Sequence, residues 1–115
     1  ACSPACATDA APAAAPQMIP LDGVDAELDR LIQRWHQLPL DQAVSAADRV
    51  FAVAQGIVDT TAGRCGIPRM PLPRLHEEHG PAVVVDQLRV VTFDAARAGV
   101  DGLAETLRRL RAQLP

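Results

Sequence analysis

Aromatic side chains are scarce in this sequence, and several residue types do not occur in it. Aromatic residues make up 3% of the 115 residues, and they are Trp35, Phe51 and Phe93. Hydrophobic residues nevertheless make up 49%, so the core has to be built from Leu, Val, Ile and Ala, which favours closely packed helices. Lys, Asn and Tyr are missing. Because their codons are rich in A and T, we expect a bacterial source with a GC-rich genome.

Cysteines and long apolar runs are also few. Cys2, Cys6 and Cys65 are odd in number and do not form the regular set of a disulfide framework. We therefore expect a reducing, cytoplasmic location. No apolar run approaches the roughly 20 residues that span a bilayer, and no charged-then-apolar leader is present. We expect no membrane partner.

Charge and motifs exclude several classes of function. The net charge is −3, and the basic residues are not clustered as a nucleic-acid footprint would require. The sequence has no P-loop, no G-x-G-x-x-G, and no nucleophile motif around Ser3 or Ser45. None of its glutamates is followed by His three residues on, as a di-iron carboxylate bundle would need. We expect no cofactor and no nucleic-acid partner. These absences favour a protein that is not an enzyme but leave that question open.

The chain divides into a tail and a helical domain. Residues 1–20 are rich in Ala and Pro, which predicts a flexible arm. Residues 21–115 form a second unit, where apolar residues recur at helical spacing, as at Val24, Leu28, Leu31 and Trp35. The sequence predicts an all-α fold, a small four-helix bundle preceded by the arm. The expected helices span about residues 22–38, 41–62, 81–98 and 101–114.

The third of these helices is the ambiguous one. Its valine-rich sequence has strand propensity, but Val84, Leu88, Val91 and Ala95 hold helical spacing, and no other segment offers a strand partner. We therefore predict a helix. The prolines that precede it, at 68, 71 and 73, enforce an extended connection.

The stretch RLHEEHG, residues 74–80, carries a possible metal site. His76 and His79 are three residues apart and share one face if this stretch is helical. Cys65 could supply a third ligand. The spacing matches no known zinc signature, so the favoured interpretation is a solvated turn.

Polar residues also recur on the two most apolar helices. Asp48, Gln55 and Asp59 share a face of one, and Gln87 and Asp94 share a face of the next. If the two strips face each other, they form a buried polar seam that can hold a ligand. If not, each strip is the solvent face of its helix, which is the favoured interpretation.

The two central helices are apolar over wide arcs, and the first of them presents more apolar surface than two neighbours readily cover. We therefore predict a non-enzymatic interaction or assembly module that pairs with a protein partner or with itself, most simply as a homodimer. The expected interaction residues are Phe51, Val58, Val90, Phe93, Arg108 and Arg111. The alternative is a small metal-binding protein using Cys65, His76 and His79, or a ligand-binding protein using Asp48, Gln55, Asp59, Gln87 and Asp94.

Overall fold

The computed structural model describes residues 18–115, with side chains from Gly23 onward. In this part of the chain the backbone forms helices and no strand. The valine-rich segment is a helix, as predicted. The helices are α2 (Met18–Gln37), α3 (Leu40–Cys65), α4 (Leu75–His79), α5 (Ala82–Arg97) and α6 (Leu103–Gln113).

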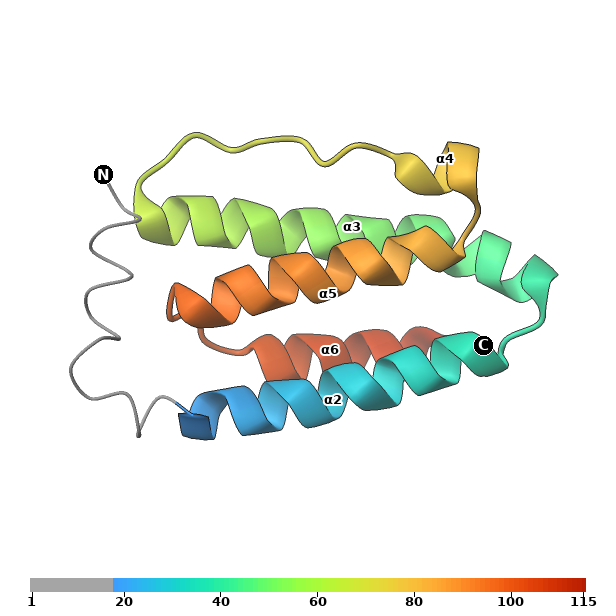
Figure 1. The fold of residues 1–115 in the computed structure, drawn as a ribbon, viewed down its shortest axis with the longest axis horizontal. Helices are drawn as coiled ribbons and strands as arrows, with labels where there is room; N and C mark the ends of the chain where they lie inside the picture. Colours follow the sequence, from blue (N-terminus) through green and yellow to red (C-terminus); the bar gives the residue numbers. More distant parts are fainter. Residues whose placement is uncertain (1–17) are drawn as a thin grey trace.

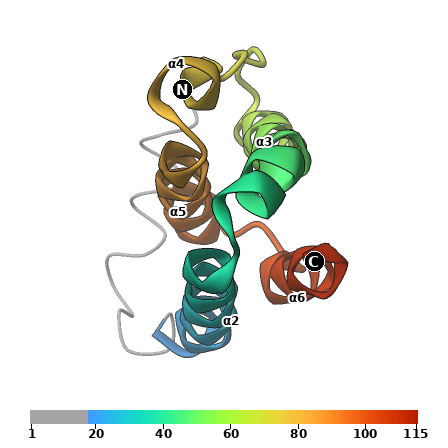
Figure 2. The same cartoon turned by 90° about the vertical axis from the view of Figure 1, so that its right-hand side faces the viewer.

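The four long helices lie in two layers, which confirms the all-α bundle. α5 and α2 form the front layer in Figure 1, and α3 and α6 lie behind them, as the end-on view in Figure 2 shows. α2 and α6 run in one direction, while α3 and α5 run in the other. Because α3 and α5 run in the same direction, the connection between them has to cross the length of the bundle.

That crossover is an extended segment, here named the strap, comprising residues 67–74. It returns along the outside of α3 to α4, a short helix that packs at the start of α5 (Figure 1). Gly66 ends α3 with a φ of 69°, a left-handed conformation that glycine adopts without strain. The next amide, Ile67 N–H, then bonds back to the Ala62 carbonyl at 3.0 Å.

The core contains almost no aromatic residues, as the composition requires. Trp35 and Phe51 are its only aromatic members among the described residues. The most deeply buried side chains come from all four long helices, and they are Leu31, Val50, Ala54, Val84, Leu88, Thr92, Ala95, Leu107 and Leu110.

Several predicted boundaries need correction. α2 begins at Met18, inside the segment predicted as an arm, and the rest of that segment, residues 1–17, lies outside the described residues. The Asp25 position therefore lies within α2. Asp41 is likewise inside α3, whose N-cap is Pro39. α6 begins at Leu103, two residues later than predicted, with Gly102 at its N-cap.

Candidate functional site

Most of the polar residues that were predicted to form strips on α3 and α5 attach the strap to these helices. The Gln55 side chain accepts a hydrogen bond from the Leu72 amide at 2.7 Å and donates to the Met70 carbonyl at 3.1 Å. It also donates to Asp59 at 3.1 Å. From α5, Gln87 donates to the Pro73 carbonyl at 2.8 Å. These side chains fix an extended segment whose own backbone forms no regular hydrogen-bond ladder.

A second attachment joins α4 to α3 through His76. Its Nε2 lies 3.0 Å from Oδ1 of Asp48, and its ring centroid lies 5.2 Å from that of Phe51. Arg74 covers the other side of the cluster. Its guanidinium is 4.8 Å from the Phe51 ring centre, and it bonds Asp48 at 2.8 Å and Glu77 at 2.7 Å. The imidazole is therefore a packing element with one polar anchor.

The contacts of this cluster favour the ionised forms of Asp48 and Arg74. The hydrogen bond from His76, together with the Arg74 guanidinium, holds the pKa of the Asp48 carboxyl below its ordinary value. Bonding to Glu77 and Asp48 raises the pKa of Arg74. Only 6% of the His76 side chain is exposed, so the prediction that RLHEEHG is a solvated turn is wrong for His76. It fits His79, which is 60% exposed.

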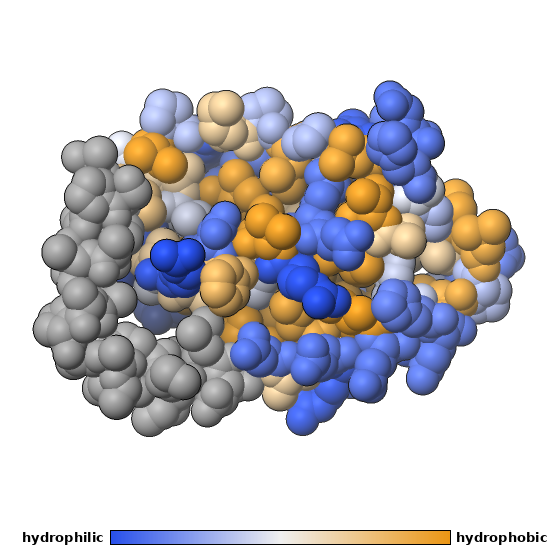
Figure 3. Space-filling model, in the orientation of Figure 1, coloured by the Kyte–Doolittle hydropathy of each residue, from blue (hydrophilic) through white to orange (hydrophobic). Residues whose placement is uncertain are grey.

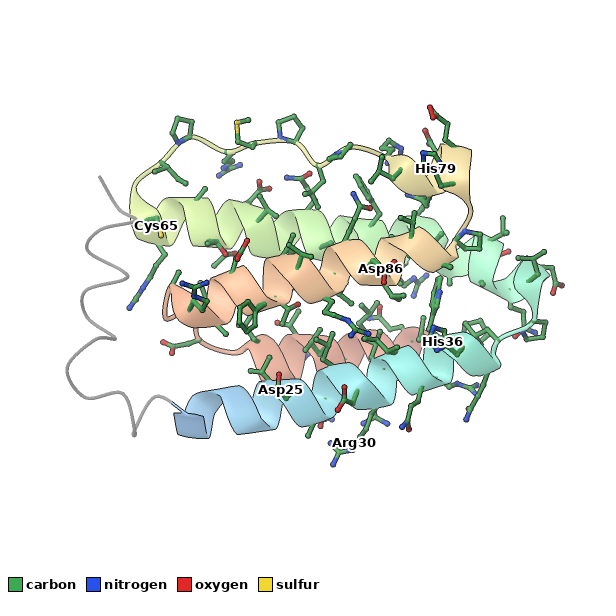
Figure 4. The ribbon with its side chains drawn as sticks, viewed as in Figure 1. Asp25, Arg30, His36, Cys65, His79 and Asp86 are labelled. Atoms are coloured by element: carbon green, nitrogen blue, oxygen red, sulfur yellow. The ribbon has the colours of Figure 1, made fainter. Side chains whose placement is uncertain are left out.

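The structure does not bring the predicted metal ligands together. Cys65 ends α3, whereas His76 contacts Asp48, 17 residues earlier on the same helix, a separation of about 25 Å at the α-helical rise. Figure 4 shows Cys65 and His79 at opposite ends of the bundle. Cys65 is also disulfide-bonded, which the cysteine pattern did not predict. Among the side chains from residue 23 onward, no group of three or more His, Cys, Asp or Glu is placed to hold a metal ion.

The predicted ligand-binding residues divide between two places. Asp48, Gln55, Asp59 and Gln87 lie along the strap and α4. Asp94 lies away from them, on the side of α5 that faces α2. The two strips therefore do not form a continuous seam.

The predicted interaction residues also separate. Phe51 is buried beneath His76 and Arg74, and Val58 is half-buried against the core. Val90 and Phe93 are exposed on α5, at 60% and 52% of their surface. Arg108 and Arg111 line a different surface, between α2 and α6. Of the six predicted interaction residues, Val90 and Phe93 are the two exposed apolar ones.

These two residues border a groove of about 500 Å³ between α2 and α5. The α2 wall consists of Val24, Asp25, Leu28 and Asp29, and the α5 wall comprises Arg89, Val90, Thr92, Phe93, Asp94 and Ala96. The space-filling view shows apolar surface along this face, interrupted by polar side chains (Figure 3). The sequence analysis did not predict the acidic wall. The signal for it in the sequence is an aspartate directly after each of the buried residues Val24 and Leu28.

Thr92 is one of the residues beside the groove, and its hydroxyl differs from those of the other threonines in its hydrogen bonding. Thr60, Thr61 and Thr106 each donate to the carbonyl four residues earlier, at 2.8–3.0 Å. Thr92 is 1% exposed, yet its Oγ1 has no hydrogen-bond partner among the described residues. A buried hydroxyl without a partner is costly, so this position is incompletely satisfied.

No helix of the described chain is both long and apolar enough to cross a membrane. Compared with family models, curated proteins and solved structures, the chain matches none of them.

Proposed function

We propose that this chain is a non-enzymatic helical assembly module that pairs with a second copy of itself through the α2–α5 groove. The observation that carries the proposal is the exposure of Val90 and Phe93 at the edge of that groove. Exposed apolar side chains beside a concave apolar surface are typical of interaction sites.

Charge complementarity favours a second copy as the occupant. Arg89 adjoins Val90, and the Arg97 guanidinium lies 5.7 Å from the Phe93 ring centre, so two basic groups flank the apolar residues of α5 against one acidic group, Asp94. The opposite wall carries Asp25 and Asp29. In a twofold contact each copy presents α5 to the partner's groove. The arginines of each copy then face the aspartates of the other copy, so the symmetry forms this contact twice.

Replacement of Phe93 tests this surface. Phe93→Asp puts a carboxylate into the apolar contact, next to an acidic wall, and is expected to convert the dimer to a monomer in sedimentation velocity at micromolar concentration. Val44→Asp is the matched control, because Val44 is 57% exposed but lies on α3, outside the groove. A Phe93→Asp protein that remains dimeric would place the interface elsewhere. The same follows if Val44→Asp alone dissociates it.

A heterologous partner is the other outcome of that experiment. If the native chain sediments as a monomer but binds an amphipathic helix of another protein through Phe93, the groove is a docking site and the twofold contact is wrong. The bacterial source and the cytoplasmic location remain predictions, and the disulfide at Cys65 removes the support that the cysteine pattern gave to a reducing compartment.

A further inference from the structure

A second hollow, of about 450 Å³, lies between α2 and α6 and is lined mainly by arginine. We call it the arginine cleft. Arg30, Gln33, Arg34 and Gln37 line it from α2, at spacings that place them on one helix face. From α6 it is lined by Arg108, Arg111 and Ala112, and no lining residue is acidic.

Nearby carboxylates neutralise only part of this charge. Glu27 bonds Arg30 at 2.9 Å and Arg111 at 3.4 Å, and Glu105 bonds Arg108 at 3.0 Å. The cleft thus holds four guanidinium groups against two carboxylates. The C-termini of α2 and α6 also contribute partial negative charge, but this effect fades beyond the last helical turn. A net positive charge remains.

Three of the arginines that line the arginine cleft have unused hydrogen-bond donors. Arg30 uses one terminal nitrogen for Glu27, and Arg34 uses one for the Pro115 carbonyl. No described residue accepts from the Nε of either arginine or from the Nε of Arg111. Guanidinium groups with free edges are well suited to oxyanions, which accept two parallel hydrogen bonds from one arginine.

The geometry points to a small organic phosphate as the ligand of the arginine cleft. A phosphate monoester carries the charge that the guanidinium groups lack, and the volume of the cleft is in the range of small-molecule sites rather than that of a bare ion. Gln33 and Gln37 provide amide groups for the uncharged part of the ligand.

Titration with ribose 5-phosphate, followed by NMR at constant ionic strength, tests the site. We expect saturable shifts at the amides of Gln33, Gln37 and Ala112 with a dissociation constant of about 1 mM or below. Inorganic phosphate should bind more weakly, and unphosphorylated ribose should give no shifts. Saturation by inorganic phosphate alone would mean that the site takes the free ion and would overturn the organic ligand.

Paired variants separate the arginine cleft from general surface charge. Arg34→Gln combined with Arg108→Gln should weaken binding by about tenfold or more, since charge-assisted hydrogen bonds are lost. Arg69→Gln combined with Arg97→Gln removes the same number of charges at positions that do not line the cleft, and should change binding by less than about twofold. Thermal unfolding without ligand checks that each variant is folded. The proposal is overturned by a native protein that shows no saturable shifts, or by equal weakening in both variants.

This ligand site is independent of the dimer. The Phe93→Asp monomer should bind ribose 5-phosphate like the native chain, so failure of either proposal leaves the other standing.

Discussion

His76 lies between the Phe51 ring and the Asp48 carboxylate, and this position predicts its contribution to stability. Removing the imidazole in His76→Ala leaves a cavity over Phe51 and deprives Asp48 of a hydrogen bond. We expect the free energy of unfolding, measured by urea denaturation, to fall by about 1–3 kcal/mol. His79→Ala is the control, because that side chain is largely exposed. It should change stability by less than about 0.5 kcal/mol. Equal effects would contradict the packing role of His76.

Asp48 makes the stability of the folded chain change with pH in the acidic range. Its pKa is lower in the folded chain than the ordinary value of 3.8, so its contribution is fully present above that value and is lost as the pH falls through the folded pKa. Asp48→Asn should therefore be less stable than the native chain at neutral pH, and the difference should narrow below about pH 4. Thermal unfolding across this range provides the measurement. A difference that is constant with pH would show that the carboxylate is not specifically paired.

The sequence predicts only part of this cluster. The spacing of His76 and His79 predicts that both lie on one face of a helical turn. It does not reveal that the strap carries α4 back over α3, and the Asp48 and Phe51 contacts depend on that return path. The same limit explains Gln55 and Gln87, which look like solvent-facing residues until the strap is placed against them.

At the scale of elements, the strap depends on its side-chain attachments. Gln55→Ala removes both hydrogen bonds to the strap backbone, and we expect faster hydrogen exchange at the Leu72 amide. The loss of stability should be about 1–2 kcal/mol, from net contributions of 0.5–1.5 kcal/mol per hydrogen bond.

The matched control for the strap is Gln42→Ala, an exposed position on the same helix. It should leave hydrogen exchange of residues 67–74 unchanged. If Gln55→Ala leaves exchange there unchanged as well, the prolines alone hold the strap and Gln55 does not.

Gly56 in the middle of α3 offers a stabilising change. A close helix–helix contact would explain a glycine here, but a Cβ at this position would meet no atom within 4 Å. Gly56→Ala should therefore stabilise the protein by up to about 1 kcal/mol, the helix-propensity difference. Its melting temperature measures the gain. A decrease would show that α3 has a packing partner at Gly56.

The apolar stripes predict the long helices because each buries one face at helical spacing. Leu28, Leu31, Ile32 and Trp35 of α2 are all buried as expected. The helix ends were less predictable, since α3 and α6 begin without a side-chain cap hydrogen bond. Backbone conformation at Pro39 and Gly102 sets the starts of α3 and α6.

On the scale of the whole molecule, α2 separates two surfaces of opposite charge. Asp25 lies on the side toward α5, whereas Arg30 lies on the outer edge of the bundle (Figure 4). Five residues rotate a helix by about 140°, so one helix supplies the acidic wall of the α2–α5 groove and the basic wall of the arginine cleft. Pairing through the groove leaves the arginine cleft accessible.

Sedimentation equilibrium of the native chain at micromolar concentration tests self-association most directly. The exposed Val90 and Phe93 have no cover within the described chain, and a twofold contact buries them against the groove of a second copy. We expect a mass of about twice the 12.2 kDa of one chain, as for a homodimer. A mass of 12.2 kDa throughout the micromolar range would contradict it.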